Sequence, residues 1–125
     1  MTDMRNISEI IGVTFDKVII NSSKETITFI EKGTNRVWIM THIQDCCEQV
    51  SVEEIIGDLS DLENSPILVA EERSNQSDTR YGSQTWTFYE FRTMKGSVTI
   101  RWLGESNGYY SEEVSFYLVE GKDDR

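Results

Sequence analysis

Short runs of β-favouring residues, separated by polar segments, recur along this chain and constrain its fold more than any other feature. The first three runs span residues 13–20, 25–31 and 36–43, and the segments between them, 21–24 and 32–35, are rich in Asn, Ser, Thr and Gly. Runs of this length with turn residues between them are typical of strands joined as hairpins. We therefore predict a three-stranded antiparallel meander in the N-terminal part of the chain.

The spacing of apolar residues changes after the third run. Here they recur three and four residues apart, at Val52, Ile55, Ile56, Leu59 and Leu62. This spacing indicates the apolar face of an amphipathic helix. Ser51 and Glu54 match a capping box, which places the start of the helix directly after a pair of cysteines. We therefore predict a central acidic helix over residues 51–63.

The segments on either side of this helix predict a second, shorter helix and more strands. Residues 6–12 begin with a cap-forming Asn and end in Gly, which predicts a short N-terminal helix. Pro66 bars continuation of the central helix, and β-favouring runs then fill residues 66–119. Within them, residues 73–83 are polar and show no apolar period, so we expect a loop there.

The C-terminal part predicts one more hairpin. Asn107 and Gly108 both tolerate positive φ, so they indicate a tight turn between two antiparallel strands. Residues 120–125 should form a frayed tail. The whole chain, residues 1–125, is then expected to be a single α+β domain of antiparallel hairpins and meanders, with about six to seven strands.

Charge and hydropathy limit what such a domain can bind. The chain has a net charge of −10, which opposes direct binding to nucleic acids and anionic membranes, because both need clustered Lys and Arg. The same charge favours a protein partner with a basic surface, although it can also serve solubility alone. No apolar run approaches the roughly 20 residues that cross a bilayer, and residues 1–6 lack the layout of a signal peptide, so we expect a cytoplasmic protein.

The segment 42–48 carries the most distinctive chemistry. His42, Asp45, Cys46 and Cys47 offer imidazole, carboxylate and thiolate ligands, which zinc accepts, and we predict a structural zinc site there. Alternatively, the cysteines are small packed hydrophobes and the histidine ends a strand. A cysteine nucleophile activated by the following helix, with His42 as its base, is disfavoured because the base lies too close in sequence. A redox bridge between adjacent cysteines is equally disfavoured.

Carboxylates dominate the stretch that follows. Nine of them lie between residues 43 and 72, with no Lys or Arg among them. Held at helical spacing, carboxylates can imitate a run of phosphates and compete for a cationic channel. We predict that this surface binds the partner, through Glu48, Glu53, Glu54, Asp58, Asp61 and Glu63. A solvated outer helix face is the alternative.

Aromatic residues gather in the C-terminal half, and most should belong to the core. Trp102 shares a strand face with Val98 and Ile100, as a core strand requires. Tyr109 and Tyr110 flank a turn instead and could stand at a recognition surface.

Several segments together resemble an uncharacterised family of small proteins found in phages and prophages. They are residues 42–48, 56–62, 65–68, 96–102 and 104–111. A looser similarity links the chain to phage anti-CRISPR inhibitors, several of which are small and acidic and occupy an effector nuclease, and some of which contain structural zinc. The resemblance implies a phage-derived context and no agreed activity, and we expect the cytoplasm of the host cell as the location.

These observations lead to one main hypothesis and two alternatives. The main hypothesis is a phage-encoded inhibitor without catalytic residues that binds a host defence protein, such as a type II CRISPR effector nuclease, through the acidic surface. The first alternative is a metal-dependent or cysteine-dependent enzyme acting on a small nucleotide at the segment 42–48. The second is a protein that sequesters a ligand with the aromatic strands and the loop around Arg80 and Tyr81.

Overall fold

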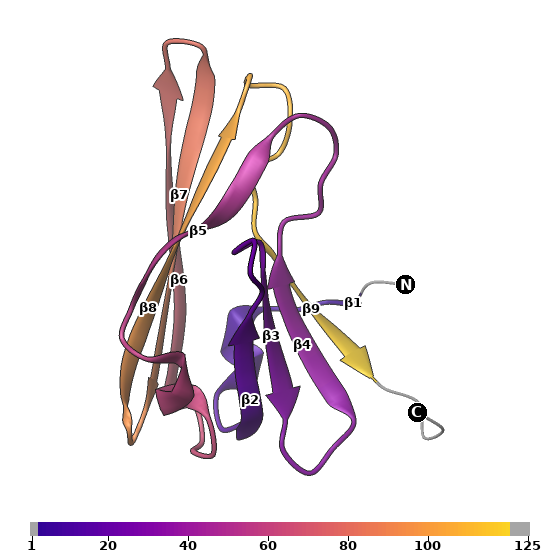
Figure 1. Cartoon of the computed structure of the whole chain (residues 1–125), viewed down its shortest axis with the longest axis vertical. Helices are drawn as coiled ribbons and strands as arrows, with labels where there is room; N and C mark the ends of the chain where they lie inside the picture. The colour runs from indigo at the N-terminus through magenta and orange to yellow at the C-terminus, as the bar shows by residue number, and fades with distance from the viewer. Residues whose placement is uncertain (1–2, 121–125) are drawn as a thin grey trace.

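The computed structural model describes residues 3–120, and nearly all of its regular structure is β-strand (Figure 1). Two single-turn 3-10 helices are present in this range, η1 (Ile7–Ile10) and η2 (Leu59–Leu62). The strands are β1 (Asp3–Met4), β2 (Phe15–Ile20), β3 (Thr26–Glu31), β4 (Arg36–Thr41), β5 (Gln49–Ile56), β6 (Val69–Thr79), β7 (Gly82–Thr93), β8 (Gly96–Ser106) and β9 (Ser115–Glu120). The described residues contain no helix long and apolar enough to cross a membrane.

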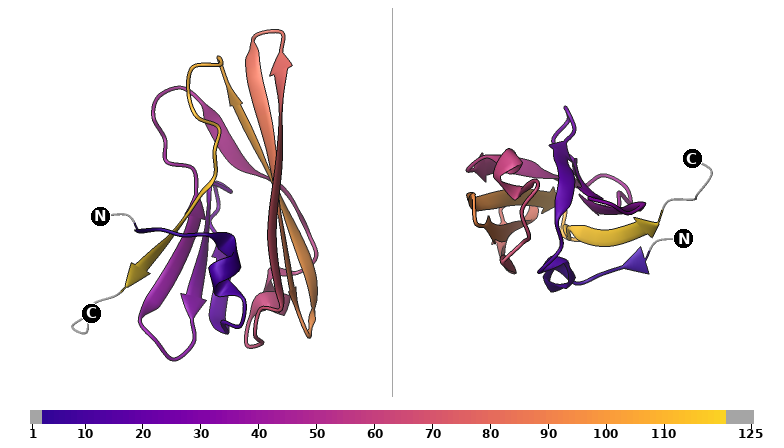
Figure 2. Two further views of the ribbon diagram at one scale, coloured as in Figure 1. Left: turned by 180° about the vertical axis from the view of Figure 1, so that it is seen from behind. Right: turned by 90° about the horizontal axis from the view of Figure 1, so that it is seen from below.

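The strands form two antiparallel sheets that pack against each other (Figures 1 and 2). One has five strands in the order β1-β9-β4-β3-β2, and the other has four in the order β5-β8-β7-β6. Strands β2, β3 and β4 pair consecutively, so the predicted three-stranded meander is present. The chain passes from the five-stranded to the four-stranded sheet between β4 and β5, and it returns between β8 and β9.

Aromatic side chains fill the space between the sheets. Phe29 of β3 lies at its centre, with ring centroids 5.3 Å from Phe15, 5.9 Å from Phe116 and 5.8 Å from Phe91 of the opposite sheet. The predicted core position of Trp102 is confirmed, since its side chain is fully buried. Alternation along each strand thus brings one face of each sheet into a common core.

The predicted central helix over residues 51–63 is wrong, and with it the α+β fold class. These residues form strand β5, which pairs with β8, followed by the short turn η2. A β-bulge between Val52 and Glu54 inserts one residue. The inward positions Val52 and Ile55 therefore lie three residues apart, and in the sequence this irregular strand imitates the period of a helix.

The predicted N-terminal helix is shorter than the sequence indicates. The Asn6 side chain and Glu9 form a capping box, but only the single turn η1 follows, because Ile11 is already extended and Gly12 has a φ of +90°.

The polar segment 73–83 is not the loop that the sequence predicts. It forms most of β6 and the turn into β7, and the two strands pair without interruption up to Thr79 and Gly82. Figure 1 shows this hairpin extending beyond the five-stranded sheet. Every residue from 71 to 80 is exposed, so neither face of this part of β6 needs apolar residues. The sequence therefore shows no alternation of apolar and polar residues there.

The hairpin predicted at Asn107 and Gly108 is also absent. β9 pairs with β4 and β1 of the other sheet, so residues 107–114 form a crossing segment between the sheets. Gly108 does have a positive φ, of +95°, but it serves this bend and not the turn of a hairpin. The predicted frayed tail lies outside the described residues from Gly121 onward.

Gly57, which ends β5, offers a test of this packing. Its φ is +108°, and a Cβ there would lie 2.6 Å from the Ser97 carbonyl oxygen, whereas Gly33 has a φ of +78° and open space around it. Gly33→Ala should cost about 1–2 kcal/mol for the left-handed backbone alone. Gly57→Ala should cost about 1–3 kcal/mol more because of the clash with β8. Urea unfolding measures both, and equal losses would contradict the close approach of β5 to β8.

Candidate functional site

His42 lies just after β4 and joins two segments that are far apart in sequence. Its Nε2 is 2.7 Å from Oε2 of Glu48, and its Nδ1 is 2.7 Å from the carbonyl oxygen of Glu113. The side chains of His42 and Glu48 are almost completely buried, with 4% and 0% of their surface exposed. Each ring nitrogen thus lies within hydrogen-bond distance of an oxygen from a different segment. His42 therefore fastens the segment 107–114 to the turn at residues 42–48.

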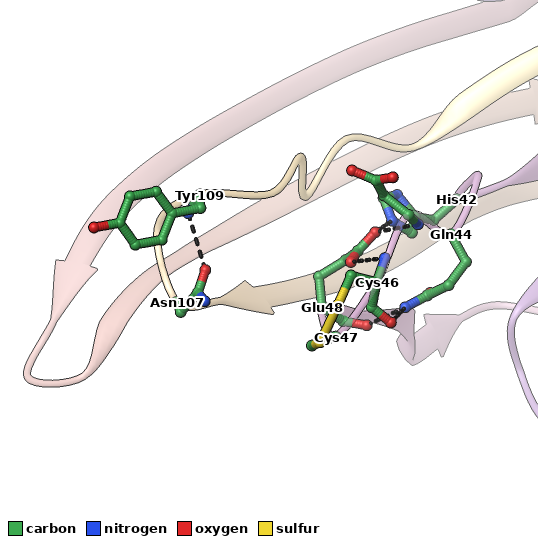
Figure 3. The surroundings of a disulfide bond; sticks show 8 residues. His42, Gln44, Cys46, Cys47, Glu48, Asn107 and Tyr109 are labelled. Atoms are coloured by element: carbon green, nitrogen blue, oxygen red, sulfur yellow. Dashed lines mark hydrogen bonds and ion pairs between the residues drawn. A yellow bond between two sulfur atoms is a disulfide. The ribbon is translucent and has the colours of Figure 1, made fainter.

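Glu48 holds this turn closed (Figure 3). It accepts hydrogen bonds from the backbone N–H groups of Asp45 at 2.7 Å and Cys46 at 2.9 Å. The hydrogen bond from His42 lowers the pKa of Glu48 to about 2; burial opposes this shift, and the backbone donors add to it. The carboxylate therefore stays ionised and serves as the structural centre of the turn.

Cys46 and Cys47 are joined by a disulfide in the structure, the bridge that the sequence disfavours (Figure 3). Disulfide sulfurs are not thiolates and cannot ligate zinc in this form. Among residues 3–120, no group of three or more His, Cys, Asp or Glu side chains is placed to hold a metal ion. Zinc binding at His42, Asp45, Cys46 and Cys47 stays a prediction, and it requires reduced cysteines and a released His42 ring.

The cysteine-nucleophile alternative loses one of its supports. The residues after Cys47 form strand β5, not a helix, so no helix dipole points at the sulfur.

The six carboxylates of the predicted partner-binding face lie on different elements and make different contacts. Glu48 is buried beneath His42, and Glu54 forms an ion pair with Arg101 on the outer face of the four-stranded sheet. Glu63 accepts a hydrogen bond from the backbone N–H of Val18 at 3.0 Å. Because the expected helix is absent, these carboxylates do not share one helical face.

The other three members of that set lie on β5 and around η2. Glu53 is exposed on β5. Asp58 caps η2 by accepting from the backbone and hydroxyl of Ser60, which lowers its pKa. Asp61 lies against Gly96. Partner binding by these residues stays a prediction.

A different acidic site lies under the long β6–β7 hairpin. It is a cavity of about 380 Å³ between the inner face of the hairpin and the segment 107–114. Its walls carry three carboxylates and six hydroxyl side chains, and no Lys or Arg is among the lining residues that the structure describes. The lining residues are Glu72, Ser74, Gln76, Ser83, Thr85, Thr87, Gly108, Tyr110, Ser111, Glu112, Glu113 and Val114.

Glu112 anchors the wall of this cavity. It is buried, and it accepts hydrogen bonds from the hydroxyls of Ser83 and Ser106, both at 2.5 Å, and of Thr85 at 2.7 Å. Burial favours the neutral acid, but these three donors lower the pKa of Glu112 overall. Glycine at position 104 makes the approach possible, since a Cβ there would lie 2.8 Å from the Glu112 Cβ.

Two buried donors lie on the same side of the sheet as this cavity. The Tyr89 hydroxyl and the Trp102 Nε1 are fully buried; Trp102 Nε1 has no hydrogen-bond partner, while burial and the adjacent Glu72 carboxylate raise the pKa of the Tyr89 hydroxyl. Tyr89 is directly opposite Glu72 on β6, and Trp102 is opposite Thr87. Residues directly opposite each other in an antiparallel pair point to the same face, and Glu72 and Thr87 both line the cavity.

The opposite face of the same sheet carries an aromatic cluster. The rings of Trp86 and Phe88 stack at 6.3 Å, and the Arg101 guanidinium lies 4.9 Å from the centroid of Trp86. Because Arg101 is also paired with Glu54, its charge is satisfied within the chain. The cluster is half-buried. Because it lies on the face away from the cavity, substitutions in it serve as controls for substitutions in the cavity.

Sequence reasoning missed Glu112 and the cavity. Polar residues at the inward positions 83, 85 and 87 of β7 were the available signal, because buried hydroxyls need a partner. Glu112, the shared partner of Ser83 and Thr85, lies on a crossing segment that the sequence predicts to be part of a hairpin strand.

The Glu48 carboxylate predicts a specific pH dependence. Its folded-state pKa lies below the ordinary value of 4.5, so its contribution to stability is complete above pH 4.5 and is lost as the pH falls towards about 2. Wild-type protein should therefore lose stability more steeply than Glu48→Gln between these values, as measured by urea unfolding at a series of pH values. Glu53→Gln, at an exposed carboxylate on β5, is the charge control. Parallel curves for wild type and Glu48→Gln would contradict the assignment.

Comparison with known proteins places the chain in a family. A search of curated proteins finds no match, and neither does a search of solved structures. The model of one family, described as a domain of unknown function (DUF7448), matches residues 5–116, which include the four-stranded sheet and the whole lining of the cavity. The chain therefore belongs to the DUF7448 family.

Proposed function

We propose that this protein is a binding module that occupies a partner with a basic surface and acts without catalysis. The observation that carries the proposal is the cavity under the β6–β7 hairpin, where Glu72, Glu112 and Glu113 line one space without any basic residue among the lining. A net charge of −10 adds long-range attraction for the same kind of partner.

The most reactive groups of the chain support binding over catalysis. Both ring nitrogens of His42 are engaged, and the sulfurs of Cys46 and Cys47 are bonded to each other. A general base must be able to reach a substrate proton, and His42 instead positions the wall of the cavity through the Glu113 carbonyl.

The narrower hypothesis is that the partner is a host defence protein, such as a type II CRISPR effector nuclease, encountered in the cytoplasm of a phage host. Its support is the sequence resemblance and the acidic charge. An acidic inhibitor should slow DNA cleavage by such a nuclease in stoichiometric amounts, and unchanged cleavage in the presence of excess protein would remove this partner.

The binding proposal predicts that Glu72 and Glu113 contribute more to binding than two exposed carboxylates elsewhere on the chain, although the charge is the same. Oligo-arginine and oligo-lysine peptides serve as probes of a basic partner, and isothermal titration calorimetry measures their binding. The double variant Glu72→Gln, Glu113→Gln should weaken binding about a hundredfold or more, because each of the two lost contacts to a charged group is worth about 1.5–3 kcal/mol.

The matched control removes the same charge elsewhere. Asp16 and Glu25 are exposed on or beside the five-stranded sheet. The double variant Asp16→Asn, Glu25→Gln should bind the peptides nearly as well as wild type. Equal weakening of the two double variants would show that only net charge attracts the peptides, and the cavity would be abandoned as the binding site.

A further inference from the structure

We propose that the open edge of strand β6 pairs with the same edge of a second copy of this chain, which joins their four-stranded sheets into one continuous sheet. The two β6 strands run antiparallel, and Gln76 of one copy lies opposite Gln76 of the other. This inference goes beyond the binding function proposed above and does not depend on it.

The edge formed by β6 is long and uncovered, unlike the other sheet edges. Strand β1 has only two residues. The edge of β5 is covered where the N–H of Val52 donates to the carbonyl of Lys24 at 2.7 Å. The edge of β2 is covered where the N–H of Val18 donates to the Glu63 carboxylate at 3.0 Å. Strand β6 spans 11 residues, and among residues 3–120 no hydrogen bond covers its outer edge.

Strand β6 also lacks the usual protection of an open edge. Natural edge strands are blunted by Lys, Pro or a β-bulge, because unpaired N–H and C=O groups are a template for another strand. Residues 69–79 contain neither Lys nor Pro, and their pairing with β7 shows no shift of register. This part of the chain is therefore suited to accept a further strand.

The turn between β6 and β7 shows which backbone groups of β6 point outward. Arg80 and Tyr81 form the turn, so Thr79 and Gly82 are the hydrogen-bonded pair that closes it. Hydrogen-bonded and non-hydrogen-bonded pairs alternate along an antiparallel ladder. The even-numbered residues between 70 and 78 therefore direct their N–H and C=O groups away from β7, where a second copy can bond them.

Side-chain chemistry selects the register at Gln76. With the two-fold axis at this residue, Glu72 of each copy lies opposite Arg80 of the other. Ser74 lies opposite Asp78, so its hydroxyl can donate to that carboxylate. Each carboxylate of the paired stretch 72–80 thus faces a donor, and opposite charges in directly opposed positions stabilise a strand pair.

Neighbouring registers are less favourable. An axis at Asn75 would place Glu72 opposite Asp78, and like charges directly opposite each other are destabilising. An axis at Ser77 would place Glu72 opposite Gly82 and would lose the ion pair.

A groove beside β6 has room for the tip of the second copy's hairpin. It has a volume of about 670 Å³ and is lined by residues 6–8, before and within η1, and by residues 70–74 of β6. In the proposed register these β6 residues face residues 78–82 of the second copy. Tyr81, which is 83% exposed in the single chain, would enter this groove and bury its ring.

The same symmetry places two acidic cavities on one face of the assembly. Gln76 lines the cavity under the hairpin and lies at the two-fold axis, which is perpendicular to the joined sheet. The two cavities are therefore neighbours and open on the same side.

Sedimentation equilibrium of the full chain tests the assembly. It is measured at about 0.15 M salt, where charges more than about 8 Å apart are largely screened, because each copy has a net charge of −10. Wild type should sediment as two copies at high protein concentration and dissociate on dilution. A wild-type chain that stays a single copy at every concentration would overturn the proposal.

Gln76→Pro tests the backbone contact at the centre of the pair. Proline removes an outward N–H from each copy but no hydrogen bond between β6 and β7, so the chain should still fold, as urea unfolding checks. Association should weaken about tenfold or more, because two hydrogen bonds are lost. Gln76→Ala keeps the N–H and should associate within about threefold of wild type. A folded Gln76→Pro protein that associates like wild type would overturn the proposal.

A charge swap tests the register independently of the proline variant. Glu72→Arg or Arg80→Glu alone places like charges opposite each other twice and should weaken association several-fold. The double variant Glu72→Arg, Arg80→Glu should restore it to within about twofold of wild type. Glu25→Arg, an exposed charge reversal beside β3, is the control and should leave association unchanged. A dimer that is insensitive to both single changes would overturn the pairing at Gln76.

Discussion

The unequal length of the two sheets is the constraint on which the rest of the structure depends. Strands β6, β7 and β8 have 11 or 12 residues, whereas β2, β3, β4 and β9 have six. At about 3.3 Å per residue the longer strands extend roughly twice as far. One end of the four-stranded sheet therefore has an inner face that the five-stranded sheet cannot cover. The crossing segment 107–114 partly covers it, and the cavity is the space that remains.

The chemistry of the segment 42–48 serves this architecture. His42 bonds the carbonyl of Glu113 and the carboxylate of Glu48, so the turn after β4 holds the crossing segment in place. Glu112, next along that segment, is then fixed by three hydroxyls from β7 and β8. The buried His42–Glu48 pair and the buried Glu112 carboxylate, whose polar groups cost free energy when left without partners, are hydrogen-bonded here and orient the wall of the cavity. The most distinctive residues of the sequence thus act as positioning residues.

The sequence predicts those parts of the fold in which local pattern and tertiary packing agree. The meander of β2, β3 and β4 and the burial of Trp102 follow from alternation and turn residues. Prediction fails where long-range pairing decides. The bulge at Val52 gives strand β5 the apolar spacing of a helix. Residues 71–79 of β6 are exposed on both faces, so the sequence there shows no alternation that would indicate a strand. Glu112 gives no local signal at all, because its partners lie 6 to 29 residues away in sequence.

The central claim is that a basic partner enters the cavity under the β6–β7 hairpin, and mapping of amide NMR shifts during titration with an arginine peptide tests it most directly. We expect the largest shifts at Glu72, Thr85, Glu112 and their neighbours on β6, β7 and the crossing segment, and little change at the indole N–H of Trp86, whose side chain lies on the outer face. Shifts concentrated on the outer face, or spread evenly over the acidic surface, would contradict it.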